Sequence, residues 1–105
     1  MFGGWRSMTH HDEAVATDRL RRALLAFRTA QTFLLAAHRQ IKTSPSAEME
    51  TFWIGPGRHI EANMRATATE VGMAFKAFSA TGLVADDDDL HRMTEARRYL
   101  AKGEA

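Results

Sequence analysis

The stretch that decides the fold is THHDEAVATDRLRRALLAFRTAQTFLLAAHRQIK, residues 9–42. It contains neither glycine nor proline, and its alanine, leucine, arginine and glutamine residues give it a high helix propensity. Thr9, followed by Asp12 and Glu13, is typical of an N-cap with acidic residues in the first helical turn. The sequence therefore predicts a helix from about His10 to about Lys42, roughly 50 Å long at about 1.5 Å per residue.

Apolar residues within this stretch follow the spacing of a heptad seam. The predicted interaction seam consists of Leu20, Leu24, Phe27, Gln31, Leu34, His38 and Ile41. A second, alanine-rich stripe beside it consists of Ala23, Ala26, Ala30, Phe33 and Ala37. The two stripes together span roughly 200° of the helix surface, which is too wide for a single neighbouring helix. We therefore expect other helices, from this chain or from a second one, to cover them, with Leu24, Phe27 and Leu34 buried.

Two polar residues, Gln31 and His38, interrupt the predicted seam. Polar residues at such positions can specify the register or the oligomeric state of a helical assembly, at a cost in stability. They can equally lie at the edge of the seam and reach water. The sequence leaves both interpretations open.

A break follows the long helix. Ser44 suits an N-cap and Pro45 suits the first turn, so a short second helix is predicted over Pro45–Ile54. The next residues, Gly55, Pro56 and Gly57, are predicted to form a hinge. Replacing either glycine with alanine should be harmful only where the backbone needs a positive φ.

Two further helices are predicted beyond the hinge. One runs from about Arg58 to Ala80, with Gly82 placed to end it, and the other opens with Asp86–Asp89 and ends before Gly103. The predicted fold is all-α: a long helical hairpin elaborated into a small bundle of about four helices, one of them short, completed by oligomerisation. We expect a flexible leader over residues 1–8 and a single helical domain over residues 9–103.

Composition excludes several classes of protein. The chain has 105 residues, no cysteine and a formal net charge of +1, so disulfide frameworks, thiol catalysis and a strong overall attraction to nucleic acid are not expected. No apolar run reaches the length of about 20 residues that a membrane span needs, and the first residues lack the apolar middle of a signal peptide. We expect a cytoplasmic protein, with secretion by another route left open and either Met1 or Met8 as the natural start.

Three groups of residues contain metal-ligand or catalytic types. His10-His11-Asp12-Glu13 is adjacent along one helix, so its side chains diverge instead of converging on a metal. Asp88 and His91 share a helical face, but no inward-facing glutamate is predicted opposite them, as di-iron bundles require. Asp86–Asp89 lacks the spaced ligands and central glycine of a calcium loop, and suits a helix start. We expect no metal, no cofactor and no catalytic site.

The first helix is locally basic by three charges. It carries Arg19, Arg21, Arg22, Arg28, Arg39 and Lys42 against Asp12, Glu13 and Asp18. Phosphates could lie along such a helix, but no aromatic residues interleave with the arginines on its polar face. Nucleic-acid binding is therefore the third hypothesis, and a solvated polar face is favoured over it.

The tripeptide Trp53-Ile54-Gly55 lies between two long helices and, if Met8 is the start, near the middle of the chain. In this respect the chain resembles the W-x-G family of type VII secretion substrates, which are helical hairpins that dimerise. Pro56 directly after the motif departs from the family pattern, and Tyr99 is not followed four residues later by an acid. The resemblance covers the hairpin outline and implies a secreted helical protein as the alternative function.

The leading prediction for function is a helical protein–protein interaction module. It would act as a homo-oligomer, most simply a homodimer, or as an adaptor that presents a helical face to another helical protein. The physical reason is the excess of apolar surface on the long helix over what the shorter third helix can cover.

Overall fold

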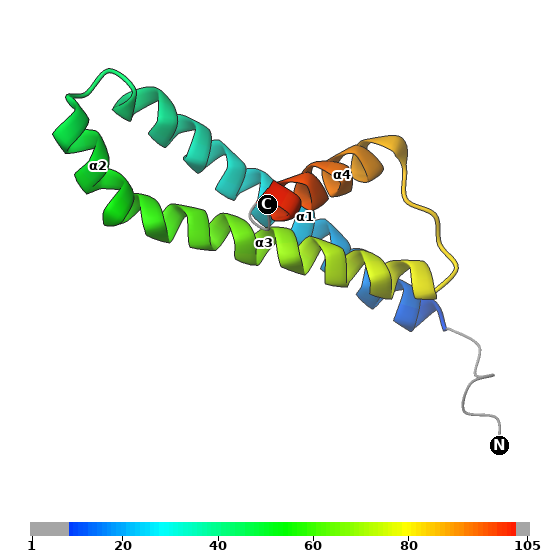
Figure 1. The fold of residues 1–105 in the computed structure, drawn as a ribbon. Helices are drawn as coiled ribbons and strands as arrows, with labels where there is room; N and C mark the ends of the chain where they lie inside the picture. The colour runs from blue at the N-terminus through cyan, green and yellow to red at the C-terminus, as the bar shows by residue number, and fades with distance from the viewer. Residues whose placement is uncertain (1–8, 103–105) are drawn as a thin grey trace.

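The computed structural model describes residues 9–102, which form four helices and no strand. These are α1 (His10–Ile41), α2 (Ser46–Ile54), α3 (Pro56–Ala80) and α4 (Asp87–Lys102) (Figure 1). The all-α prediction, with one short helix among about four, is confirmed. The predicted leader, residues 1–8, and the predicted stop at Gly103 lie outside the described residues.

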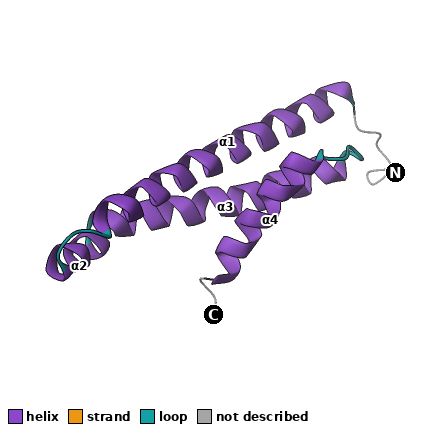
Figure 2. Ribbon diagram, turned by 90° about the horizontal axis from the view of Figure 1, so that it is seen from above, coloured by secondary structure: helices purple, strands orange, loops and turns teal. Residues whose placement is uncertain are grey.

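The long helices α1 and α3 lie side by side and run in opposite directions, and α2 closes one end of this hairpin (Figure 1). Helix α4 packs obliquely on α3 and also touches α1 (Figures 1 and 2). The radius of gyration is 17.6 Å. A compact domain of this length would have a value of about 13 Å, so the fold is elongated and leaves much of each helix exposed.

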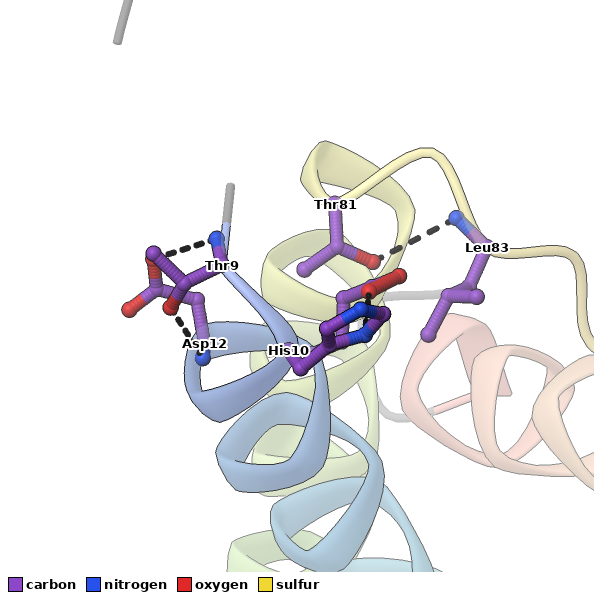
Figure 3. A network of polar contacts seen from close by, with 6 residues as sticks. Thr9, His10, Asp12, Thr81 and Leu83 are labelled. Atoms are coloured by element: carbon purple, nitrogen blue, oxygen red, sulfur yellow. Dashed lines mark hydrogen bonds and ion pairs between the residues drawn. The ribbon is translucent and has the colours of Figure 1, made fainter. Parts of the chain in front are cut away.

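The start of α1 follows the capping pattern expected from the sequence. The Asp12 backbone N–H donates to Thr9 Oγ1, and the Thr9 backbone N–H donates to Asp12 Oδ2, each at 3.1 Å (Figure 3). This reciprocal capping box satisfies two backbone donors that a helix start leaves free. The predicted N-cap and the acidic first turn are confirmed.

Small side chains dominate the contact between α1 and α3. Ala23 and Ala30 of α1 and Ala68 and Ala74 of α3 are all buried in one cluster. Alanine lets two helix backbones approach closely, so larger residues fill the space on either side. The largest fully buried side chains are Phe27, Leu20 and Val71.

The start of α2 differs from the prediction. Its N-cap is Pro45, which makes no side-chain capping hydrogen bond, whereas the Ser44 backbone N–H donates to the Ile41 carbonyl at 2.9 Å. The predicted N-cap role of Ser44 is therefore wrong. Ser44 belongs to the turn that ends α1, and the new helix begins after the proline, at Ser46.

The connection between α3 and α4 uses glycine as expected. Gly82 has a φ of 89°, the single positive φ among the described residues, and its N–H donates to the Ser79 carbonyl at 3.0 Å. Thr81 Oγ1 accepts from the Leu83 N–H at 3.3 Å (Figure 3). The α3 helix ends at this left-handed residue because glycine adopts that conformation without steric penalty.

Across residues 9–102, none of the helices combines the length and apolar character that a membrane span requires.

Candidate interaction surface

The predicted seam on α1 divides between the core and the surface. Leu20, Leu24 and Phe27 are buried, Gln31, Leu34 and Ile41 are half-buried, and His38 is exposed. The three buried residues lie in a cluster with side chains of α3 and α4, and Leu34 packs against that cluster. In the folded chain this part of the seam is thus covered intramolecularly.

The alanine stripe faces the same neighbours. The buried residues of α1 are Ala16, Leu20, Ala23, Leu24, Phe27, Ala30 and Ala37. Relative to the predicted seam, the centre of the buried face is rotated toward the alanines, because their small side chains permit the closest helix contact. This rotation moves Gln31 and His38 away from the centre of the contact, but it is too small to bury Ala26 and Phe33, which lie at the far edge of the alanine stripe and are exposed.

Gln31 lies where α1 meets α4. Its Nε2 donates to Glu95 Oε2 at 3.1 Å, and Glu95 Oε1 lies 3.6 Å from His91 Nε2 within α4. The amide therefore joins two helices of the same chain. Gln31 is half-buried and contacts a polar side chain of α4, and its role in specifying register stays a prediction.

His38 lies near the closed end of the hairpin. Its ring centroid is 4.7 Å from that of Trp53, and Phe52 meets Trp53 edge-on at 4.9 Å. Although none of the nine residues of α2 is buried, the contact between His38 and Trp53 joins α2 to the end of α1. His38 thus stands at the surface beside α2 and outside the buried core.

The predicted hinge is narrower than expected. Gly55 ends α2 and begins α3, whereas Pro56 and Gly57 belong to the first turn of α3. Neither glycine has a positive φ, so the predicted conformational reason for them does not apply. Gly57 is buried, and a Cβ built on it would lie within 3.0 Å of Trp53 Cδ2 and Cζ3 and still closer to Cε3. The reason for glycine at this position is the close approach of the Trp53 ring.

The acidic clusters occupy helix starts. Asp86 Oδ1 accepts from the Asp89 N–H at 2.8 Å, at the first turn of α4. Partial burial, and secondarily the neighbouring Asp86, raise the pKa of the Asp89 carboxyl. At the start of α1, His10 Nδ1 lies 3.5 Å from Glu13 Oε1 (Figure 3). Within residues 9–102, no group of three potential ligands converges as a metal site would require.

One ion pair joins the two long helices. Arg19 Nε and Nη2 donate to Glu70 Oε2 and Oε1 at 2.8 and 2.9 Å, a two-point contact between guanidinium and carboxylate. This hydrogen bonding holds the pKa of the Glu70 carboxyl below its usual value and raises the pKa of Arg19. Both side chains are about two-fifths exposed, at 40% and 42%. Because both side chains are partly exposed to solvent, the pair adds little to the stability of the fold.

The two most exposed of the large apolar side chains on α1 lie on its outer face. Leu25 is 64% exposed and Phe33 is 63% exposed, about 12 Å apart along the helix at about 1.5 Å per residue. Between them lies a shallow groove of about 360 Å³. We call this the outer groove; it is lined by Leu25, Arg28, Thr29, Thr32, Phe33 and Ala36. It points away from the buried face, and Figure 2 shows α1 along one edge of the molecule with α3 and α4 on the same side of it.

Sequence reasoning placed Phe33 in the alanine stripe and did not single out Leu25. The signal was nevertheless present, because Leu25, Thr29, Phe33 and Ala36 have helical spacing and share one face of α1. From the sequence, the apolar arc of about 200° formed by the seam and the alanine stripe is expected to be one continuous surface. In the structure the buried face covers most of this arc, and the outer groove lies beyond it, with Phe33 as the one residue that the groove shares with the predicted stripes.

Comparisons of this chain with protein-family models, with curated proteins and with solved structures found no match.

Proposed function

We propose that this chain is a helical protein–protein interaction module that binds its partner through the outer groove of α1. The observation that carries the proposal is the exposure of Leu25 and Phe33 at the two ends of one groove, on a helix whose opposite face is buried. Single exposed apolar residues are ordinary on protein surfaces. Two large apolar residues that border one groove, as Leu25 and Phe33 do, form an apolar surface with a defined shape. Such a surface is typical of a binding site for a helix or peptide.

The groove has the form that helix packing uses. Residues i, i+3, i+4 and i+7 of a helix surround a hole that accepts one side chain of a neighbouring helix. Leu25, Arg28, Thr29 and Thr32 are one such set. Thr29, Thr32, Phe33 and Ala36 are the next. The outer groove therefore offers two successive holes, and the partner is a helix, either from a second copy of this chain or from another protein acting with this chain as adaptor.

The test is site-directed photo-crosslinking combined with light scattering on the full chain. Phe33 is replaced by a photoreactive phenylalanine, and Met73, which is 55% exposed on α3, receives the same replacement as a matched control. We expect an adduct of defined mass from position 33, lost when Leu25→Ser is added, and none from position 73. A chain that gives no Leu25-dependent adduct, either with itself or when mixed with helical peptides that carry leucines one turn apart, would contradict the proposal.

The secreted alternative is supported by one observation, the position of Trp53 at the bend between α1 and α3, as the W-x-G resemblance implies. Its test is co-expression with a type VII secretion ATPase. If this alternative is correct, the parent chain is found in the medium, and the Trp53→Ala substitution abolishes its export. Retention of the parent chain inside the cell would speak against it.

A further inference from the structure

We propose that the partner helix of the outer groove is acidic and belongs to a protein other than this chain. This inference rests on the proposed function and specifies the chemistry of the partner. It follows from how charge is distributed around the groove and from the shape of the groove floor.

The rim of the outer groove is basic. Arg28 lies within the groove, Arg22 three residues before its first residue, and Arg39 three residues after its last. All three side chains are exposed. Arg22 pairs with Asp18 at 2.9 Å, whereas Arg28 and Arg39 have no ion pair within residues 9–102. Two arginines are therefore available to carboxylates on a partner.

Acids are scarce near this rim. From Arg19 to Ala47 the chain contains no aspartate or glutamate. Two acids of α4 approach this side of α1: Asp89 shares a depression with Leu25 and Arg28, and Glu95 accepts from Gln31 Nε2 at 3.1 Å. The negative charge of the Asp89 carboxylate already interacts with the positive charges of Arg92 and Arg21. Positive charge thus dominates the edge of the groove, and a helix with glutamate or aspartate beside its apolar residues is its electrostatic complement.

The same charges disfavour a second copy as the occupant. In a twofold dimer each copy offers the same surface, so Arg22, Arg28 and Arg39 of one copy would face the arginines of the other. Like charges brought together across an interface cost free energy; Asp18 offsets Arg22 alone, and the segment from Arg19 to Ala47 offers no acid to offset Arg28 and Arg39.

The groove floor favours a helix over a lipid surface. A membrane would contact a continuous convex band of large apolar side chains. Here the large residues Leu25 and Phe33 stand on either side of the small residues Thr29 and Thr32, and Ala36 lies beyond Phe33, which leaves holes beside the small side chains. Thr32 Oγ1 donates to the Arg28 carbonyl at 3.0 Å, so its hydroxyl is already satisfied within the helix. Such holes accept two aliphatic side chains one helical turn apart.

The experiment is a selection from a displayed library of helical peptides against the full chain. The library keeps leucines one turn apart and varies each flanking position among Glu, Gln and Lys. We expect glutamate to be enriched over lysine by at least about tenfold, corresponding to about 1.4 kcal/mol. Binding should be lost on the Leu25→Ser/Phe33→Ser variant and retained on Met73→Ser, and the preference for glutamate should disappear on Arg28→Gln/Arg39→Gln.

Each other outcome has a defined meaning. Groove-dependent peptides that are neutral or basic would overturn the acidic partner while leaving the proposed function intact. The absence of any groove-dependent peptide would overturn both. Light scattering that shows a dimer lost in Phe33→Ser would assign the groove to a second copy. Groove-dependent flotation with phosphatidylserine-containing vesicles, in the absence of peptide enrichment, would assign it to lipid.

Discussion

Phe27 and Phe33 are the same residue type fewer than two turns apart on one helix, yet Phe27 is 1% exposed and Phe33 is 63% exposed. They lie about 120° apart around the helix axis at about 100° per residue, which is enough to place them on different faces. Phe27 contributes to the core shared with α3 and α4, whereas Phe33 ends the outer groove. The comparison shows that hydrophobicity on this helix serves two purposes, folding on the inner face and, as we propose, binding on the outer face.

The largest expected effect comes from the inner face. Phe27→Ala should destabilise the fold by about 3 to 5 kcal/mol, because it removes a fully buried ring and leaves a cavity. Phe33→Ala, the matched control, should change the free energy of unfolding by no more than about 0.5 kcal/mol. Denaturant unfolding of both variants measures this. Equal losses at the two positions would mean that Phe33 is covered in solution.

A second pair of substitutions compares a glycine at the closed end of the hairpin with a glycine in the middle of α3. Gly57→Ala should destabilise by about 1 to 3 kcal/mol, because the new methyl group would collide with the Trp53 ring. Gly72→Ala should instead stabilise by about 0.4 to 1 kcal/mol, since no atom lies within 4 Å of its Cβ position and alanine favours the helix. Thermal unfolding distinguishes the two. If Gly57→Ala leaves the temperature of unfolding unchanged, the Trp53 ring does not pack closely against Gly57 in solution.

The smallest effect concerns the ion pair that joins the two long helices. The pKa of Glu70 is lowered in the folded chain by its hydrogen bonds to Arg19, so the unfolded chain takes up a proton at higher pH than the folded chain does. The pair's contribution is present above the unfolded value of about 4.3 and is lost as the pH falls through the lowered folded value.

Unfolding measured between about pH 6 and 3 should therefore show a pH dependence that becomes weaker in both Glu70→Gln and Arg19→Gln. Exposure to solvent keeps this contribution small. A pH dependence that neither substitution alters would show that the pair does not persist in solution.

The helices could be predicted from the sequence because their signals are local. The capping box at Thr9, the left-handed Gly82 and the acids that open α4 each depend on residues within one turn, and each lies where it was expected. Ser44 and the hinge are the exceptions, since the Ser44 backbone N–H closes the turn that ends α1 and α3 begins at Pro56 instead of near Arg58.

Tertiary structure alone decided how the apolar surface is divided. Heptad spacing identified which residues of α1 are apolar, but whether the contact centres on the leucines or on the alanines depends on how closely α3 approaches, and that is set by Ala68 and Ala74 on a distant segment. The same is true of Gly57, whose role depends on Trp53. The sequence by itself determined the positions of the four helices, whereas the buried face of α1, the edge positions of Gln31 and His38 and the outer groove were decided by packing between helices, because a side chain's burial depends on neighbours that local sequence does not specify.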